Sequence, residues 1–122
     1  MKLVIQRNRF IDTHNIYIKL FQMHKSYLLL VSDQEEMGIG NVTLSSPPTI
    51  EGLNSTAASY GLFGIKEKII SKIIAEKASR ILKTPVLLLY FLKNVKDEEN
   101  IAKELTSFFN DFLDESLGEI NQ

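Results

Sequence analysis

The chain has 122 residues, of which 44% are hydrophobic and 24% charged, and it contains no cysteine. This balance is typical of one globular domain, and it argues against a disordered chain, a disulfide framework and a thiolate zinc site. The formal net charge is −1, but residues 61–96 carry eight basic and two acidic side chains, whereas residues 97–122 carry one and eight. We therefore expect one domain over residues 1–122 with no overall attraction for nucleic acid.

The start of the chain and its apolar runs bear on its location. No apolar run approaches the roughly 20 residues that cross a bilayer. Residues 1–7 place charged side chains too early for a signal peptide. From these two features we expect a soluble, cytoplasmic protein that has no membrane partner.

Four strands are predicted in the first half of the chain, at residues 2–10, 16–21, 27–31 and 41–45. The second strand has aliphatic side chains at every other position, which is the period of a half-buried strand. Turn-forming residues at 12–15 and 23–26 separate the first three strands and predict an antiparallel meander. Pro47 and Pro48 end the fourth strand.

The segment of residues 49–61 is rich in small polar side chains, which predicts a loop. Loops longer than about 12 residues are uncommon in a small domain and are often functional. We therefore expect this loop to contribute to the binding of a partner protein. Its candidate contact residues are Leu53, Asn54 and Tyr60.

Isoleucines recur at helical spacing from residue 64 to residue 83 and predict an amphipathic helix. The helix is expected to end before Pro85, because the residue that precedes a proline avoids helical backbone angles. Ile70 and Ile74 lie on the predicted sheet-facing side. Ser79 lies on the opposite side, which is predicted to face water.

A second buried strand and a second helix follow. Residues 86–92 form a short apolar run, which predicts a buried strand. Asp97 is a suitable N-cap, and the acidic residues that follow it favour a helix N-terminus. We expect this helix to extend to about Glu115, with Gly118 marking its end.

The resulting order is β-β-β-β-loop-α-β-α, which predicts an α+β fold. We expect an antiparallel sheet of about five to six strands, with two amphipathic helices packed mainly on one face. Two of the strands, 27–31 and 86–91, are apolar on both faces. Two helices on one side leave the other side of these strands uncovered, so we expect a dimer that pairs through the sheet. The alternative is one helix on each face.

Motifs of common enzyme classes are absent from the sequence. It has no phosphate-binding loop, dinucleotide-binding glycine pattern, nucleophile-elbow serine or zinc-protease helix. The two histidines, His14 and His24, fall in predicted turns, and His14 lies near Asp12. We therefore expect no enzyme, no catalytic residue, no metal and no cofactor. The rival interpretation is a small enzyme that acts through His14, Asp12 and the 49–61 loop.

A basic stripe is predicted along one side of the first helix, at Lys66, Ile69, Ile73, Lys77 and Arg80. Isoleucines flanked by basic groups suit a partner surface that has an apolar centre and an acidic rim. Alternatively, the two isoleucines belong to a wide core face that is covered by the stems of the lysines. In the first case these five residues, with those of the 49–61 loop, bind the partner.

The last third of the chain has a distinctive order of features. A basic helix end, KASRILK (77–83), leads into the buried run TPVLLLYF (84–91), and a polar turn with Asp97-Glu98-Glu99 precedes a helix that ends in acidic residues. This arrangement resembles the C-terminal half of the proteasome assembly chaperone 4 family, to which assembly chaperone 3 is related. The resemblance covers residues 60–117, and the first 50 residues match as strands of the right number and length.

The resemblance implies an α+β, non-enzymatic chaperone that holds proteasome α-type subunits during ring assembly. Proteins of this family pair as dimers, so a homodimer, or a heterodimer with a related assembly chaperone, is implied. Binding to the α-type subunit is implied to be transient, because the chaperone leaves before the particle matures. The rival interpretation is a small dimeric scaffold of another complex, since fold does not fix function.

Overall fold

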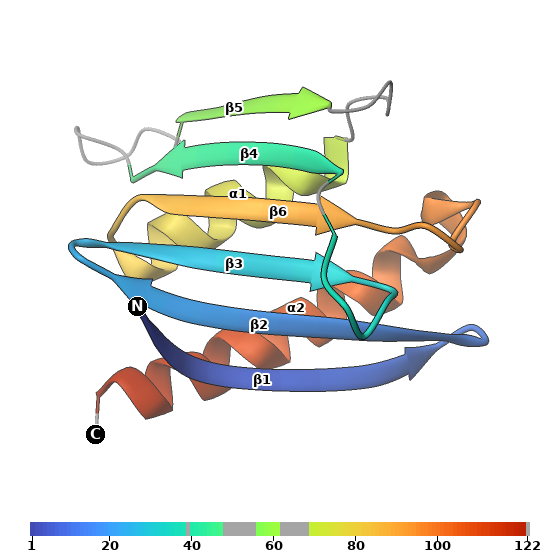
Figure 1. Ribbon diagram of the computed structural model, residues 1–122, viewed down its shortest axis with the longest axis horizontal. Coiled ribbons are helices and arrows are strands. Elements are labelled where there is room, and N and C mark those ends of the chain that lie inside the picture. Colours follow the sequence, from blue (N-terminus) through green and yellow to red (C-terminus); the bar gives the residue numbers. More distant parts are fainter. Residues whose placement is uncertain (39, 48–55, 62–68, 122) are drawn as a thin grey trace.

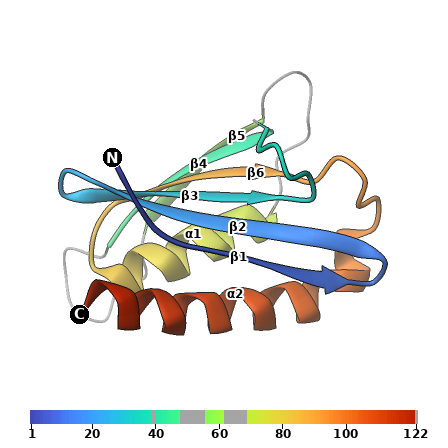
Figure 2. The same ribbon diagram turned by 60° about the horizontal axis from the view of Figure 1, so that its bottom comes forward.

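The computed structural model describes residues 1–38, 40–47, 56–61 and 69–121. These residues form a six-stranded sheet and two helices (Figure 1). The elements in chain order are β1 (Lys2–Ile11), β2 (His14–Met23), β3 (Ser26–Ser32), β4 (Asn41–Ser46), β5 (Thr56–Gly61), α1 (Ile69–Leu82), β6 (Val86–Phe91) and α2 (Glu98–Ile120). The predicted α+β class is confirmed, with both helices on one face of the sheet (Figure 2).

The first three strands form the predicted antiparallel meander. Asp12 and Thr13 have φ angles of 44° and 68°, which is the left-handed pair that a tight two-residue hairpin turn requires. Along β2, Ile16, Ile18 and Leu20 have no exposed surface. Their period of two directs one face of the meander into the core beneath the helices.

β6 lies in the middle of the sheet, whose strand order is β1-β2-β3-β6-β4-β5. It pairs parallel with β3 and antiparallel with β4. The sheet is therefore mixed, whereas an antiparallel sheet was expected. The physical reason is α1, which carries the chain over one face of the sheet and returns it between β3 and β4, as parallel pairing requires a long crossover.

Part of the segment predicted as a loop is a strand. Residues 56–61 form β5, which pairs antiparallel with β4 at the edge of the sheet. Its sequence, TAASYG, has only Thr56 and Tyr60 as residues typical of strands, and the small residues between them give no apolar alternation. Backbone hydrogen bonding to β4 defines this strand, and the side-chain pattern carries no signal for it.

α1 packs against β4 through small side chains. Ser71 and Ser79 have no exposed surface, and both lie against hydroxyls of β4. The hydroxyl of Thr43 donates to Oγ of Ser71 at 3.3 Å, and the hydroxyls of Ser45 and Ser79 are 2.9 Å apart. The prediction that Ser79 faces water is therefore wrong, because β4 offers a polar partner at this point of the interface.

α2 begins as predicted and ends later than predicted. The carboxylate of Asp97 accepts a hydrogen bond from the backbone N–H of Asn100 at 3.2 Å, which is an N-cap. The helix passes Glu115 and Gly118 and ends at Ile120. Gly118 faces open space, since a Cβ added there would meet nothing within 4 Å, so its position inside the helix has no packing cause.

The core lies between the sheet and the helix layer formed by α1 and α2. The buried aromatic residues of α2, which supply much of its volume, are Phe108, Phe109 and Phe112. They meet the helix-facing aliphatic side chains of β1, β2, β3 and β6. One whole face of the sheet is thus used for the core, and the opposite face is available for something else.

Candidate functional site

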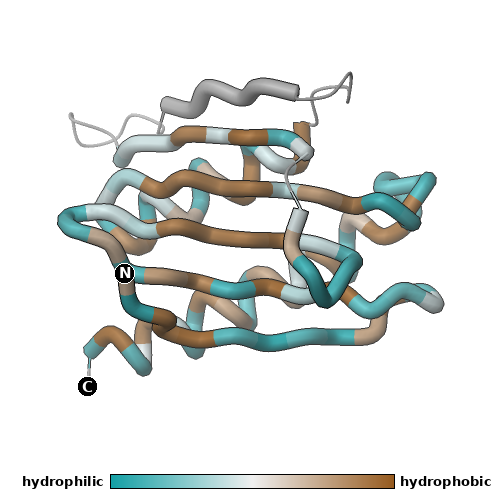
Figure 3. The backbone as a smooth tube through the Cα atoms, viewed as in Figure 1, coloured by the Kyte–Doolittle hydropathy of each residue, from teal (hydrophilic) through white to brown (hydrophobic). Residues whose placement is uncertain are grey.

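The sheet face opposite the helices carries a broad set of apolar side chains. Leu28 and Leu30 on β3 lie opposite Leu87 and Leu89 on β6, and all four are half-buried. Leu44 on β4 lies opposite Leu87 and is 53% exposed. Figure 3 shows the hydrophobic residues of β3 and β6 running through the middle of the sheet. We call this surface the open face; its apolar residues include Leu3, Phe21, Leu28, Leu30, Val42, Leu44, Leu87, Leu89 and Phe91.

The open face has the character of a protein-binding surface. Soluble monomers rarely expose a contiguous apolar surface of this kind, because its contact with water is unfavourable. Both helices lie on the other side of the sheet, so the alternative of one helix on each face is wrong (Figure 2). Within the part of the chain that the structure describes, no helix covers the open face.

The connection between β3 and β4 covers one end of the open face (Figure 1). Gly38 lies so close to Phe91 that an added Cβ would be 2.5 Å from the ring. At Gly40 an added Cβ would be 2.8 Å from the carbonyl oxygen of Tyr90. Both distances are shorter than real Cβ contacts, so glycine is required where this connection crosses the end of β6.

Asp33 fixes the start of this connection. Its carboxylate accepts hydrogen bonds from the backbone N–H groups of Lys93, Asn94 and Val95 at 2.9, 2.5 and 3.0 Å. Burial raises the pKa of Asp33, but the hydrogen bonds from these N–H groups and from Gln34 outweigh it, so the pKa lies below its usual value of 3.8. Asp33 thereby joins the end of β3 to the segment that precedes α2.

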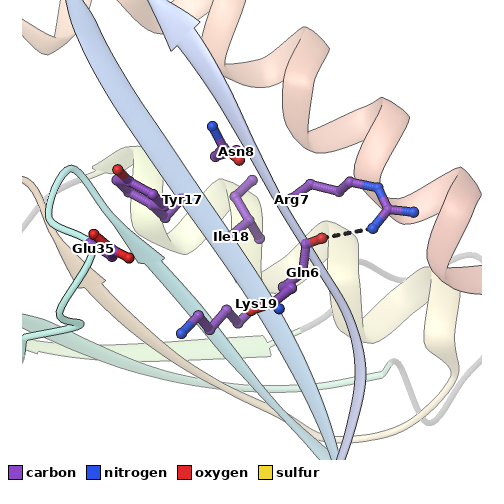
Figure 4. Close-up of a pocket in the computed structure, with 7 residues that line it drawn as sticks. All are labelled: Gln6, Arg7, Asn8, Tyr17, Ile18, Lys19 and Glu35. Carbon is purple, nitrogen blue, oxygen red and sulfur yellow. Dashed lines mark hydrogen bonds between the residues drawn. The ribbon is translucent and has the colours of Figure 1, made fainter.

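A polar cleft lies beside the open face, between β1, β2 and the β3–β4 connection (Figure 4). It has a volume of about 350 Å³ and is lined by Gln6, Arg7, Asn8, Tyr17, Ile18, Lys19 and Glu35. Lys19 lies opposite Leu30 in the register, so this cleft borders the apolar residues directly. An apolar centre with a polar rim is the usual composition of a protein interface.

A second cleft of about 280 Å³ lies at the ends of β4 and β6 and includes Gly40, Tyr90 and Glu98. The Tyr90 hydroxyl donates to Oε2 of Glu98 at 3.3 Å. Burial raises the pKa of Tyr90, and the negative charge of Glu98 raises it further, so the phenol remains protonated. This hydrogen bond joins the end of β6 to the first turn of α2.

The histidine-centred rival site gains no support from the geometry of the described residues. Neither of the two clefts is lined by His14 or Asp12. Asp12 instead accepts a hydrogen bond from the side-chain amide of Asn100 at 3.1 Å. The described residues contain no group of three histidine or acidic side chains that could hold a metal ion. None of the helices described is long and apolar enough to cross a membrane.

The predicted basic stripe is brought together in part. Ile69 is 78% exposed and Ile73 is 55% exposed, so the alternative that they belong to the core is wrong. Arg80 is exposed on the same side of α1, whereas the ammonium group of Lys77 donates to the side-chain oxygen of Asn110 on α2. We call Ile69, Ile73 and Arg80 the α1 ridge.

In the part of the chain that the structure describes, none of the remaining predicted contact residues is shown to lie next to the α1 ridge. Leu53, Asn54 and Lys66 lie outside the described residues. Tyr60 lies in β5, with its backbone opposite Val42. The predicted contact residues do not include the open face, although the two doubly apolar strands already pointed to it as a candidate surface.

The helix layer carries opposite charges on its two helices. α1 contains three basic side chains and one acidic, whereas α2 contains seven acidic and one basic. Two of the acidic groups of α2 are paired with β1, because Arg7 lies 2.7 Å from Glu115 and Arg9 lies 2.9 Å from Asp111. These pairs are about half exposed, so they contribute little to stability.

Comparison with known proteins gives a likeness in fold. No protein family model matches the sequence, and no curated protein matches it. Among solved structures, the chain is similar to one chain of a chaperone complex for yeast 20S proteasome assembly, with a TM-score of 0.56 over 98% of each chain and 13% sequence identity. The protein therefore shares, over almost its whole length, the fold of a chain from a proteasome assembly chaperone complex.

Proposed function

We propose that this protein is a non-enzymatic assembly chaperone that dimerises and transiently binds a proteasome α-type subunit during assembly of the α-ring. The observation that carries the proposal is the likeness in fold to a chain of the yeast proteasome assembly chaperone complex, which extends over 98% of both chains. The resemblance of residues 60–117 to an assembly chaperone family supports it from the sequence. A chaperone needs binding surfaces and no reaction centre, in agreement with a molecule whose marked features are an apolar sheet face and an apolar helix ridge.

The open face is the proposed dimer interface, and its partner is a second copy of this chain or a related chain of the same fold. Its central leucines are neutral and lie together on one sheet face, and apolar sheet faces pack against each other in the manner of a β-sandwich. Burial of the open face removes from water side chains that the helix layer leaves uncovered. The polar cleft at its border then lies at the rim of the interface.

Two matched substitutions test the dimer. Leu44 on the open face is 53% exposed and Ile73 on α1 is 55% exposed, so Leu44→Asp and Ile73→Asp place the same charge at equally accessible sites on opposite sides of the molecule. Size-exclusion chromatography with light scattering measures the mass of each variant, against 13.9 kDa for one chain. We expect a dimeric mass for the unchanged protein and for Ile73→Asp, and a single-chain mass for Leu44→Asp. A single-chain mass for the unchanged protein, alone and with related chaperones of its source, contradicts the proposed dimer.

Binding to purified proteasome α-type subunits, one at a time, tests the client. We expect the dimer to bind one of them, and not to bind the mature proteasome, because an assembly chaperone leaves before maturation. A stable dimer that binds none of the α-type subunits would favour a scaffold of another complex. His14→Ala is expected to leave binding unchanged.

A further inference from the structure

We infer that the α1 ridge is a second protein-binding surface, separate from the open face, and that it takes an apolar segment of the client flanked by acidic side chains. The inference rests on the proposed function, because it names where the client of the proposed chaperone binds. It is carried by the exposure of the ridge, by the sign of the charges around it, and by its place on the molecule.

The exposure of the ridge is not a by-product of core packing. α1 meets the sheet through residues that are fully buried, among them Ser71, Ala75 and Ala78. Ile69 and Ile73 are one turn apart on the opposite side of the helix, at 78% and 55% exposure. Neither isoleucine belongs to the core that the described residues form, and β-branched residues also have no advantage over polar ones as helix formers.

The charges beside the ridge select an acidic partner. Arg80 continues the line of Ile69 and Ile73 along the helix, at a spacing of seven residues from Ile73 that returns it to the same side. Lys83 is exposed directly beyond the end of α1. Glu76, the single acidic side chain of α1, lies on the same side of the helix between Ile73 and Arg80, so the excess positive charge is at the C-terminal end of the ridge, at Arg80 and Lys83. Acidic groups at the edge of a bound apolar segment would meet these cations and gain both orientation and association rate.

The neighbouring helix favours a protein over a nucleic acid or an anionic membrane. α2 lies beside α1 in the helix layer, with seven acidic side chains and one basic (Figure 2). Adjacent packed helices are about 8–10 Å apart, which is about one Debye length at physiological salt, so the charges of α2 reach α1 in weakened form. An extended anionic surface laid across α1 would therefore meet the repulsion of α2. The surface charge of a folded protein can change from negative to positive over this distance, so its acidic part can lie over α1 and a basic or neutral part over α2.

The ridge and the open face lie on opposite sides of the sheet (Figure 2). A chain that binds its dimer partner through the open face thus keeps the ridge accessible. A dimer then has two equivalent ridges. A client binds to one of them, or contacts both at once. This separation also makes the two surfaces independently testable.

The test measures the affinity of the full-length protein for the purified proteasome α-type subunit that it binds. The variants are Ile73→Asp and Arg80→Glu, with Lys103→Glu as the control, because Lys103 is exposed on α2 and its reversal changes the net charge equally. We expect Kd to rise about tenfold or more for Ile73→Asp, the scale of an interface anchor. We expect Kd to rise about threefold to tenfold for Arg80→Glu in low salt, and less in about 0.5 M salt. Lys103→Glu is expected to bind like the unchanged protein.

Three results decide against the inference, and they are distinguishable from one another. If the unchanged protein binds an α-type subunit and all three variants bind it equally, the client docks elsewhere and the proposed function stands. If the unchanged protein binds no α-type subunit, the proposed function fails, and the inference fails with it. If the unchanged protein binds vesicles that contain phosphatidylserine and Arg80→Glu abolishes this, the ridge is a membrane surface.

Discussion

Asp33 holds together two connections that are distant in the sequence. Its carboxylate, in a residue that is 8% exposed, accepts three backbone N–H bonds from the segment that precedes α2. An asparagine at this position keeps the size but presents a single acceptor oxygen and loses the charge. We expect Asp33→Asn to lower the free energy of unfolding by about 2 kcal/mol. Urea unfolding measures this, with Glu35→Gln, an exposed carboxylate in the same connection, expected to change stability by less than about 0.5 kcal/mol.

The same carboxylate makes stability depend on pH in a defined direction. Its pKa in the folded protein lies below the usual 3.8, since the backbone hydrogen bonds outweigh the effect of burial. The unfolded chain therefore binds this proton more readily than the folded chain does. The stability that Asp33 contributes is fully present above the unfolded pKa and is lost as the pH falls through the folded pKa. We expect the difference in unfolding free energy between the unchanged protein and Asp33→Asn to be constant from about pH 7 to about pH 5, and to shrink below about pH 4. A difference that is the same at about pH 3 and about pH 7 contradicts this.

At the scale of elements, the contact of α1 with β4 leaves no room for a large side chain. Ser79 has no exposed surface, and its hydroxyl lies 2.9 Å from that of Ser45. We expect Ser79→Leu to lower the free energy of unfolding by about 1–3 kcal/mol, because it overfills the interface and removes the hydrogen bond between the hydroxyls of Ser45 and Ser79. The adjacent Arg80→Leu places the same side chain at an exposed position and is expected to change stability by less than about 0.5 kcal/mol. Thermal or urea unfolding measures the stability of the two variants. Equal stability of Ser79→Leu and Arg80→Leu contradicts the close contact between α1 and β4.

The elements that could be predicted are those with a signal in their own residues. The hairpin turn at Asp12 and Thr13, the N-cap at Asp97 and the apolar period of β2 are local features, and the structure has all three. β5 could not be predicted, because its small side chains carry no strand pattern and its pairing is made by the backbone of β4. The environment of Ser79 could not be predicted either. The helical period shows which side of α1 a residue is on, but the strand that packs against that side depends on the sheet topology.

The two candidate surfaces could likewise be predicted only in part, because the sequence indicates apolar residues while the topology determines where they come together. The runs 27–31 and 86–91 indicated that one sheet face lacks a cover, and their direct pairing in β3 and β6 concentrates this signal in the middle of the sheet. That pairing is parallel and depends on the crossover through α1. It could not be predicted from the order of the strands in the sequence, because β3 and β6 are not consecutive. For Ile69 and Ile73, the helical period left a choice between core and surface. The small residues of α1 decided it, because they bring the opposite side of the helix against β4.

At the scale of the whole molecule, a single layer of two helices on a six-stranded sheet leaves half of the sheet surface for a partner. If the open face is a dimer interface, folding and pairing are linked by mass action, because the paired chains are stabilised and the unfolded chains are not. We therefore expect the Tm of the unchanged protein to rise by about 2–4 °C for each tenfold increase in protein concentration. Leu44→Asp is expected to lose this dependence, whereas Ile73→Asp keeps it. A Tm that does not depend on concentration in any of the three proteins contradicts pairing of the open face with a second copy of this chain.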